Sequence, residues 1–223
     1  MSRAIWTTCA ASGIGLEIAR AFSAAGATVF ITGINEAALA QAQKEIPGLL
    51  TSVCDDSKRS DIERMVPAAV AALGGLDVLV NNAGIGGPTA PVEAVDPDAW
   101  DTVLAVNITG TFHVTRLAIP HLKKFGRCAK TLAIELGGHN IRANAIAPGA
   151  VGGQRIKNVL AGRAKAAGTS VDDARASMLS MQSLKRFVDP KDIAALCVYL
   201  ASDAGKSISG QVIPIDNDAH QAS

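Results

Sequence analysis

The chain of 223 residues is poor in aromatic residues, which make up 4% of it, and it contains a single tyrosine, Tyr199. A tyrosine can act as a proton donor when a lysine four residues later on the same helix face lowers its pKa. Asp203 stands at that position instead. The sequence therefore lacks a tyrosine–lysine pair for proton transfer.

Metal-binding patterns of cysteine and histidine are missing as well. The four cysteines, Cys9, Cys54, Cys128 and Cys197, lie far apart and form no CxxC motif, and the four histidines show no metal-ligand spacing. We expect no metal site, and we expect reduced thiols inside a cytoplasmic protein.

The chain also lacks an excess of charge and any long apolar run. Its formal net charge is +1 with scattered basic residues, which argues against nucleic acid or an anionic membrane as a partner. No apolar run approaches the ~18–20 residues that a bilayer-spanning helix needs. The first residues lack the apolar core of a signal peptide, so the expected location is the cytoplasm.

The residues that are present predict one α/β domain over 1–223. Hydrophobic residues make up 48%, enough for a substantial core. Strand patterns alternate with helical periodicity in the first part of the chain, which predicts a doubly wound parallel sheet. The expected strands are 3–9, 27–33, 49–54 and 76–80, and the expected helices are 14–25, 37–46 and 60–73, the last with a Ser60–Glu63 capping box.

The second part of the chain is richer in helix. A long helix is expected over 98–124, followed by helices over 130–136 and 189–200. A helical insertion is expected over 154–185, where Ser170 and Asp173 could cap its second helix. Strands are expected over 141–146 and 211–215, and no linker or repeat divides the chain.

A glycine-rich turn, Ser12-Gly13-Ile14-Gly15, lies between the first strand and its helix. Glycines there let the backbone approach a pyrophosphate, and the helix N-terminus supplies N–H groups and positive potential. Taken alone, the pattern is weak evidence for a pyrophosphate site, and a tight strand-to-helix turn is the alternative explanation.

Further motifs occur in a specific order. Asn81-Asn82-Ala83-Gly84 follows the fourth strand, Asn107 lies in the long helix and Pro148-Gly149 follows a later strand. Together with the turn and the C-terminal region 189–215, they resemble the short-chain dehydrogenase/reductase family over nearly the whole chain. The resemblance implies a Rossmann-type fold and hydride transfer between NAD(P)(H) and a carbonyl or secondary alcohol.

The resemblance also implies the site residues. Asn107 would hold a water of the proton relay, or alternatively bond the backbone at a helix kink. Asp55 would accept from the adenine amino group, or alternatively be a solvated turn residue. The implied cofactor-binding residues are Ser12, Gly13, Ile14, Gly15, Gly33, Asp55, Asn81, Ala83, Gly84, Pro148, Gly149 and Val151.

Some positions depart from the family pattern. Cys9 replaces the first glycine of the turn, where a thiol adds bulk near the pyrophosphate. Gly33 replaces the acid that bonds the ribose hydroxyls in NAD enzymes, which leaves room for a 2′-phosphate, and Ile34 stands where an arginine is common. NAD and NADP both stay open, with NADP favoured.

A larger departure lies in the middle of the chain. The family has a fifth strand with a serine and then a helix that opens with Tyr-x-x-x-Lys, but residues 125–129 are too few for these elements. We expect a join within 123–129, a sheet lacking the usual fifth strand, and a strand 141–146 that must pair elsewhere. The nearby Lys123, Lys124, Lys130 and His121 are expected to be solvated, and Tyr199 to pack in a helix.

Three interpretations remain at this stage. The chain is an oxidoreductase with residues 151–185 as its substrate lid, a catalytically dead nucleotide-binding or scaffold protein, or a product that folds poorly. The resemblance further implies a homodimer or homotetramer formed through the helices around 100–136 and the last strand.

Overall fold

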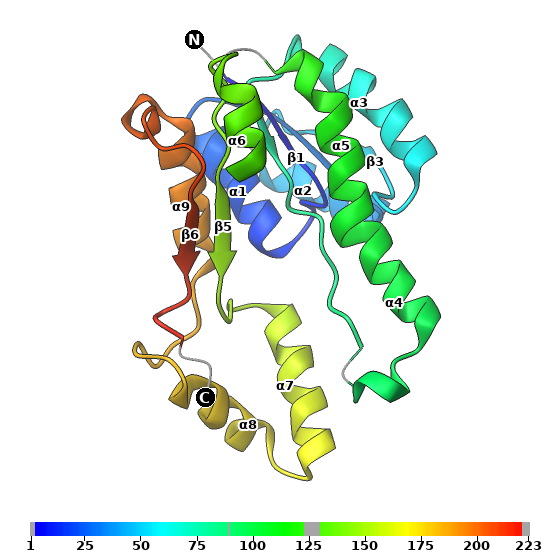
Figure 1. The fold of residues 1–223 in the computed structure, drawn as a ribbon, viewed down its shortest axis with the longest axis vertical. Coiled ribbons are helices and arrows are strands. Elements are labelled where there is room, and N and C mark those ends of the chain that lie inside the picture. Colours follow the sequence, from blue (N-terminus) through cyan, green and yellow to red (C-terminus); the bar gives the residue numbers. More distant parts are fainter. Residues whose placement is uncertain (1–2, 89, 123–129, 220–223) are drawn as a thin grey trace.

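The computed structural model describes residues 3–88, 90–122 and 130–219. Four parallel strands form the larger sheet, in the order β3-β2-β1-β4. Figure 1 shows this sheet between layers of helices. The predicted doubly wound α/β fold is confirmed, and the strands span β1 (Ala4–Thr7), β2 (Thr28–Gly33), β3 (Leu50–Val53) and β4 (Val78–Val80).

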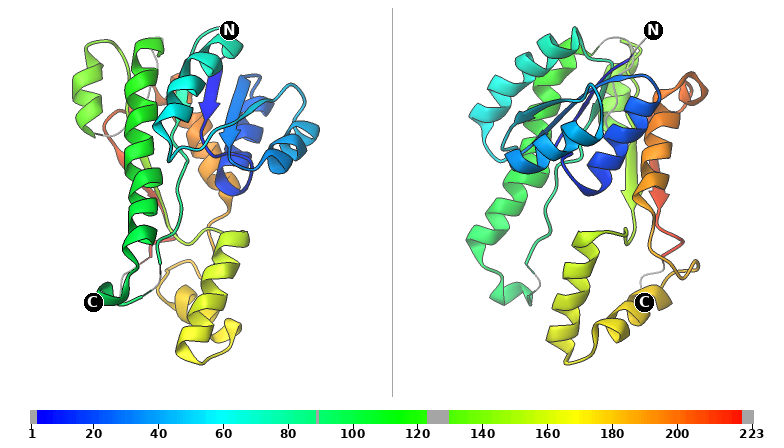
Figure 2. Two further views of the ribbon diagram at one scale, coloured as in Figure 1. Left: turned by 90° about the vertical axis from the view of Figure 1, so that its right-hand side faces the viewer. Right: turned by 180° about the vertical axis from the view of Figure 1, so that it is seen from behind.

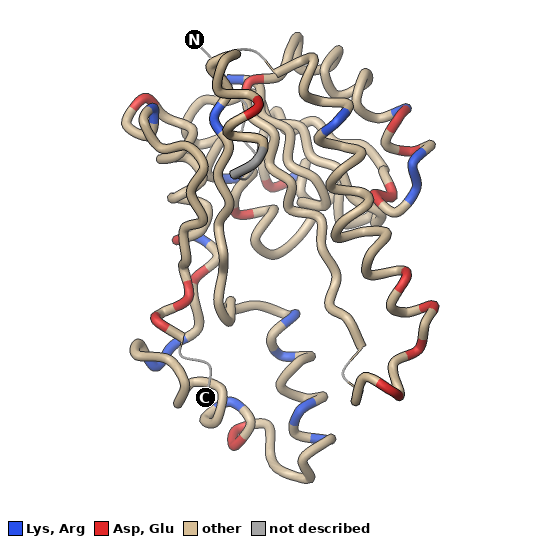
Figure 3. The backbone as a smooth tube through the Cα atoms, in the orientation of Figure 1, with Lys and Arg blue, Asp and Glu red and all other residues tan. Residues whose placement is uncertain are grey.

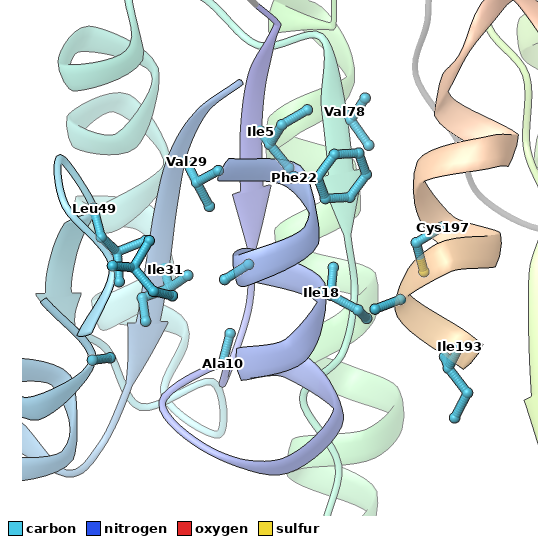
Figure 4. Packing of buried hydrophobic residues seen from close by; sticks show 14 of the residues in the cluster. Ile5, Ala10, Ile18, Phe22, Val29, Ile31, Leu49, Val78, Ile193 and Cys197 are labelled. Carbon is cyan, nitrogen blue, oxygen red and sulfur yellow. The ribbon is translucent and has the colours of Figure 1, made fainter. Parts of the chain in front are cut away.

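Alternate side chains of the strands enter two separate apolar layers. Ile5 and Ile31 pack with α1 (Gly13–Ala24), α2 (Glu36–Glu45) and α9 (Pro190–Ala201) on one face (Figure 4). Trp6 and Phe30 pack on the other face with α3 (Arg59–Leu73) and α5 (Thr111–Ala118). This period of two explains why the central strands are buried on both faces.

The long helix after β4 is confirmed over its described part. Helix α4 (Pro97–Leu104) begins at Asp96, whose carboxylate accepts from the N–H of Ala99. A π segment, η2 (Ala105–Gly110), joins it to α5, and a 3₁₀ turn, η3 (Ile119–His121), ends the run. A 3₁₀ turn, η1 (Val92–Ala94), precedes the helix. Residues 123–129, which contain the expected join, lie outside the described residues.

The last two strands form a sheet of their own. Among the described residues, β5 (Ala145–Pro148) pairs only with β6 (Val212–Ile215) and not with β4. Within the described ranges no strand pairs with the outer edge of β4, although Leu122 forms a parallel bridge with Leu76 just before that strand. The strand expected at 141–146 begins later than predicted, because the side chain of Asn144 bonds the carbonyl of Ile208 and the N–H of Gln211.

A buried arginine ties this small sheet to the helix beside it. Arg142 is 8% exposed, and its guanidinium donates to the carbonyls of Leu200 (2.9 Å), Gly205 (2.8 Å) and Ile208 (3.2 Å). These carbonyls lie at and just beyond the C-terminal end of α9, in the region of η4 (Asp203–Gly205), where a helix leaves carbonyls unpaired and favours a cation.

The remaining helices are α6 (Lys130–Gly137), α7 (Gln154–Ala167) and α8 (Val171–Ser180). Figures 1 and 2 show α7 and α8 as an arm that projects from the sheets. The Ser170–Asp173 capping box of α8 is confirmed. The capping box predicted at Ser60 is wrong, since α3 begins one residue earlier and Lys58 precedes it without a side-chain cap.

Candidate functional site

The glycine-rich turn connects β1 to the N-terminus of α1. Gly13 has φ +57°, and a Cβ at this residue would meet no atom within 4 Å. The residue before the helix, Ser12, is extended and exposed, and its hydroxyl does not cap the helix. The first N–H groups of α1 thus lack a side-chain cap and suit an anion such as a phosphate.

The turn packs closely on the segment that follows β4. A Cβ on Gly15 would lie 2.5 Å from Asn82 Nδ2 and 2.7 Å from Ala10 Cα, so only glycine fits there. Asn82 Nδ2 donates to the carbonyls of Thr8 (3.1 Å) and Cys9 (3.0 Å). The Thr8 hydroxyl in turn accepts from the N–H groups of Asn82 and Ala83. Two motifs about seventy residues apart are therefore held as one unit.

Asn107 lies in the π segment and bonds the backbone of the same loop. Its Oδ1 accepts from the N–H of Ile85 at 2.8 Å, and its Nδ2 donates to the Ile85 carbonyl at 3.0 Å. A Cβ on Gly84 would lie 3.7 Å from Asn107 Oδ1. Asn81 Nδ2 donates to Thr115 Oγ1 at 2.8 Å. Asn107 thereby holds the loop after β4 against the long helix.

Asp55 and Gly33 lie together at the outer end of the larger sheet, where the Gly33 carbonyl accepts from Cys54. The Asp55 carboxylate accepts from the hydroxyl (2.6 Å) and the N–H (3.0 Å) of Ser57, and Lys58 Nζ lies 3.3 Å from it. Hydrogen bonds from Ser57 lower the pKa of Asp55. The next residue is buried, and burial raises the pKa of Asp56 to about 6.

The third group of predicted residues follows β5. Gly149 packs on β6 so closely that a Cβ would lie 2.7 Å from Asp216 Cα, and its N–H donates to Ile215. Val151 forms a bridge with Val188. A cavity of about 420 Å³ lies between this region and β4, and Ile14, Asn81 and Pro148 all line it. The structure therefore brings residues from three predicted motifs to one cavity.

Comparisons with known proteins agree with this geometry. Residues 3–129 match the family model described as short chain dehydrogenase, and residues 126–220 match the model described as Enoyl-(Acyl carrier protein) reductase. The chain belongs to the short chain dehydrogenase family. Its homologues and structural neighbours are oxidoreductases of this family.

Two curated relatives cover nearly all of this family member. D-beta-hydroxybutyrate dehydrogenase of Cupriavidus necator is 33% identical in an alignment 244 residues long, gaps included, which covers 94% of this chain and 94% of the relative. 3-oxoacyl-(acyl-carrier-protein) reductase FabG of Thermotoga maritima is 33% identical in an alignment 243 residues long, which again covers 94% of each chain. Among solved structures, actinorhodin polyketide ketoreductase with NADPH has a TM-score of 0.90 at 26% identity, covering 97% of this chain and 96% of its own.

Cys9 and Tyr199 are two residues of this short chain dehydrogenase at which the sequence raised a question about function. Cys9 adopts φ 49°, a left-handed conformation that costs roughly 1–2 kcal/mol for a residue with a Cβ. Tyr199 lies on α9 with 47% of its surface exposed, and it does not line the cavity. Within the described residues, no group of three or more histidine, cysteine or acidic residues could hold a metal ion.

Sequence reasoning did not assign roles to several residues that shape the site. Thr8 and Asn82 join the two motifs, although only their place in the motifs was noted. Arg155, at the start of α7, reaches the Gly84 carbonyl at 3.5 Å. Thr111 and Asn144 also line the cavity. No sequence signal marks Arg155 or Asn144, because their neighbours are distant in the chain.

Proposed function

We propose that this chain binds a nicotinamide dinucleotide across the edge of the larger sheet where β1 and β4 end. The uncapped N-terminus of α1 would face the pyrophosphate, with Ser12, Gly13, Ile14 and Gly15 around it. The observation that carries the proposal is the hydrogen bonding of Asn82 and Thr8, which places that turn beside the segment after β4. The open space at Gly13 fits the close approach of a phosphate.

The other site residues belong to the same proposal. Asp55 and Gly33 would lie at the adenosine end, Asn81, Ala83 and Gly84 along the middle, and Pro148, Gly149 and Val151 at the nicotinamide end. Asn107 would act by holding the loop at Ile85 in place, because both polar atoms of its amide bond that residue. Water would reach its amide only by competing with these bonds.

We propose NADP in preference to NAD. Gly33 carries no carboxylate to bond the ribose hydroxyls or repel a 2′-phosphate, and the next residue, Ile34, is 70% exposed. Solved neighbours carry either dinucleotide: actinorhodin polyketide ketoreductase was solved with NADPH and 7 alpha-hydroxysteroid dehydrogenase with NADH. The proposed preference for NADP over NAD therefore concerns a site at which members of the family bind either dinucleotide.

The reaction we propose is hydride transfer between NAD(P)(H) and a small carbonyl compound or secondary alcohol. The bound dinucleotide would supply or accept the hydride. The relatives include a hydroxybutyrate dehydrogenase, an oxoacyl reductase and a hydroxysteroid dehydrogenase, and each of these names contains a hydroxy or an oxo group. The α7–α8 arm would be the substrate lid of a single-domain protein, and Arg155 at its start contacts the loop after β4.

A second candidate function is nucleotide binding without turnover. It is favoured by the single tyrosine, Tyr199, which lies on α9 away from the cavity. The alignment with the Cupriavidus relative runs over 244 residues, more than the 223 of this chain, so the relative has residues without a counterpart here. The two family models meet at residues 126–129, within the expected join. We propose that the serine strand and the Tyr-x-x-x-Lys segment are absent.

We further propose a cytoplasmic homodimer or homotetramer. Exposed apolar side chains recur every four residues along the helical run from α4 to α5, namely Trp100, Leu104, Ile108 and Phe112. An exposed apolar stripe of this kind marks a protein interface. The described cysteines are free thiols, as in a reducing compartment. In the part of the chain that the structure describes, no helix has the length and apolar character needed to span a bilayer.

The test has three parts on one preparation. Intact mass first shows whether the chain is the 22.8 kDa protein that the sequence gives. Fluorescence titration with NADPH and NADH then measures binding, and turnover is assayed with 3-hydroxybutyrate and a hydroxysteroid. Turnover supports the oxidoreductase, binding alone supports the second candidate, and no binding overturns both.

A variant makes the binding result specific. Ser12→Asp places a carboxylate at the N-terminus of α1, where it caps the helix but repels a phosphate. We expect at least about tenfold weaker dinucleotide binding with unchanged or raised thermal stability. Ser170→Asp at the start of α8 is the control. Equal binding by both variants would contradict the placement of the pyrophosphate.

A further inference from the structure

Arg155 joins the two segments that follow β4 and β5. It lies in the first turn of α7, beyond the end of β5, and its guanidinium reaches across to the loop after β4. Nη1 lies 3.5 Å from the Gly84 carbonyl, and a Cβ on Gly86 would lie 3.5 Å from Nη2. Ligands of open α/β sheets bind in the crevice outside the carboxyl ends of the strands. The guanidinium of Arg155 therefore lies where this fold is expected to hold a ligand.

Most hydrogen-bond donors of this guanidinium are available to a ligand. An arginine side chain carries five N–H groups, and among the described residues Arg155 donates only to Gly84, through a long hydrogen bond. Arg20 and Arg59 instead pair with glutamates, and Arg142 donates to three carbonyls. No acidic residue of the described chain forms an ion pair with Arg155.

The charge around Arg155 is positive. Helix α7 also contains Lys157, Arg163 and Lys165 and has no acidic residue. Figure 3 shows these basic residues along the arm, apart from the acidic start of α4. The loop 84–87 on the other side of the guanidinium carries no charged side chain. A cleft lined by charge of one sign attracts small ions of the opposite sign, so this part of the crevice favours an anion.

We propose that Arg155 determines substrate specificity by binding the carboxylate of a small oxo or hydroxy acid, which rests on the oxidoreductase function proposed above and names its substrate class. The planar fork of arginine matches a carboxylate with two parallel hydrogen bonds. A phosphate would suit the same fork, but the proposed pyrophosphate lies at the turn before α1, whereas Arg155 lies in the proposed substrate lid. A neutral ketone would leave the guanidinium without a counter-charge.

The test measures binding rather than turnover. Levulinate and methyl levulinate share one ketone, and only levulinate carries a carboxylate. Each is titrated calorimetrically into the purified full chain with saturating NADP⁺, which has no hydride to transfer. We expect levulinate to bind at least about tenfold more tightly than its ester. Equal affinities, or no binding of levulinate, would overturn the proposal.

Variants of α7 locate the carboxylate. Arg155→Met should weaken levulinate binding at least about tenfold and leave the binding of methyl levulinate unchanged. If Arg155 served only to hold the arm against the loop, both ligands would lose affinity equally, which would refute the proposal. Arg163→Met removes the same charge from the same helix and is the matched control. An equal loss in both variants would show an effect of net charge alone and would also refute it. Because both side chains are exposed, thermal unfolding of each variant should match the parent.

A titration of the cofactor separates this proposal from the proposed function. Arg155→Met should bind NADP⁺ as tightly as the parent. A tenfold loss of NADP⁺ affinity in this variant would assign the guanidinium to a phosphate of the cofactor and overturn the carboxylate site. If the parent itself fails to bind NADP⁺, the proposed dinucleotide site is wrong, and the levulinate titrations are made without cofactor. A preference for the acid that disappears in Arg155→Met would then still support the carboxylate site, and the lack of that preference would overturn it.

Discussion

The larger and smaller sheets contain strands of similar length but hold them by different means. Strand β1 is buried at all four residues, whereas the four residues of β5 and of β6 are half-buried or exposed, with Val212 53% exposed. Strand β1 has neighbours on both edges and helices on both faces, while β5 has one neighbour within the part of the chain that the structure describes. Burial of a strand thus depends on its partners more than on its own residues.

The smaller sheet has few buried apolar contacts and is held instead by hydrogen bonds from two polar side chains, which we call polar anchors. Arg142 bonds three carbonyls around the end of α9, and Asn144 bonds the segment before β6. Burial lowers the pKa of Arg142. An anchor of this type depends on one side chain, whereas the larger sheet spreads its stability over many apolar contacts. The following changes test that contrast, from the largest effect to the smallest.

The strongest test removes the arginine anchor. Arg142→Met leaves three carbonyls without their donor, and each buried unpaired group costs about 1–3 kcal/mol. We expect a loss of roughly 3–5 kcal/mol in the free energy of unfolding, measured by urea denaturation. Exchange of the backbone amide hydrogens should become faster in β5 and β6 than in β1 and β2. The control is Arg163→Met on the exposed face of α7, and uniform acceleration across both sheets would contradict the contrast.

The matching test in the larger sheet is Gly15→Val. The added Cβ would collide with Asn82 Nδ2 and with the backbone at Ala10. We expect destabilisation of about 3 kcal/mol and loss of dinucleotide binding, because the turn must move away from the segment after β4. Gly162→Val in α7, where a Cβ meets no atom within 4 Å, should change stability by less than about 0.5 kcal/mol. Full NADPH binding by Gly15→Val would argue against the proposed site.

A buried carboxyl group beside the larger sheet makes the stability of the protein depend on pH. Burial raises the pKa of Asp56 from 3.8 to about 6, so the folded state holds this proton more tightly than the unfolded state. The resulting stabilisation is complete below about pH 4 and is lost as the pH rises through about 6. Asp56→Asn should remove this dependence of stability on pH, and it should raise the free energy of unfolding at pH 7 by about 2 kcal/mol.

Urea unfolding at pH 4.5, 5.5 and 7 measures the effect. Asp101→Asn, on the exposed side of α4, is the control and should keep the slope of the parent. Stability of the parent that rises between pH 4 and 6 would show that other acids dominate and that Asp56 is not the responsible group.

The smallest expected effect lies in the arm. Ser170→Ala removes the hydroxyl that accepts from the N–H of Asp173, a capping bond worth about 1 kcal/mol. We expect faster hydrogen exchange in α8 and a nearly unchanged global transition, since the arm projects from both sheets. Figure 3 shows the basic residues of α7 opposite the acidic start of α4. Attraction between these charges could hold the arm in place, so the exchange measurement should be repeated at high salt, which screens it. Ser177→Ala is the control within α8.

Much of the larger sheet could be predicted because its signals are local. The strand pattern over 3–9, the helical periodicity over 14–25 and the glycine-rich turn each depend on residues a few positions apart. The capping box at Ser60 failed because the pattern fits a helix start that the structure places one residue earlier. The late start of β5 and the anchor at Arg142 could not be predicted, because their partners lie about sixty residues away in the chain.

The sequence by itself indicated the family through the resemblance of its motifs, and it predicted the parallel α/β architecture and the glycine-rich turn, because periodicity and turn glycines are encoded in neighbouring residues. It also determined that Tyr199 has no lysine partner four residues on. Only the tertiary structure decided that Asn82 and Thr8 hold two motifs together and that, among the described residues, β5 pairs with β6 and not with β4. It also decided that Arg142 donates to three carbonyls at and beyond the end of α9. These features depend on contacts between distant segments, which packing alone brings within hydrogen-bonding distance.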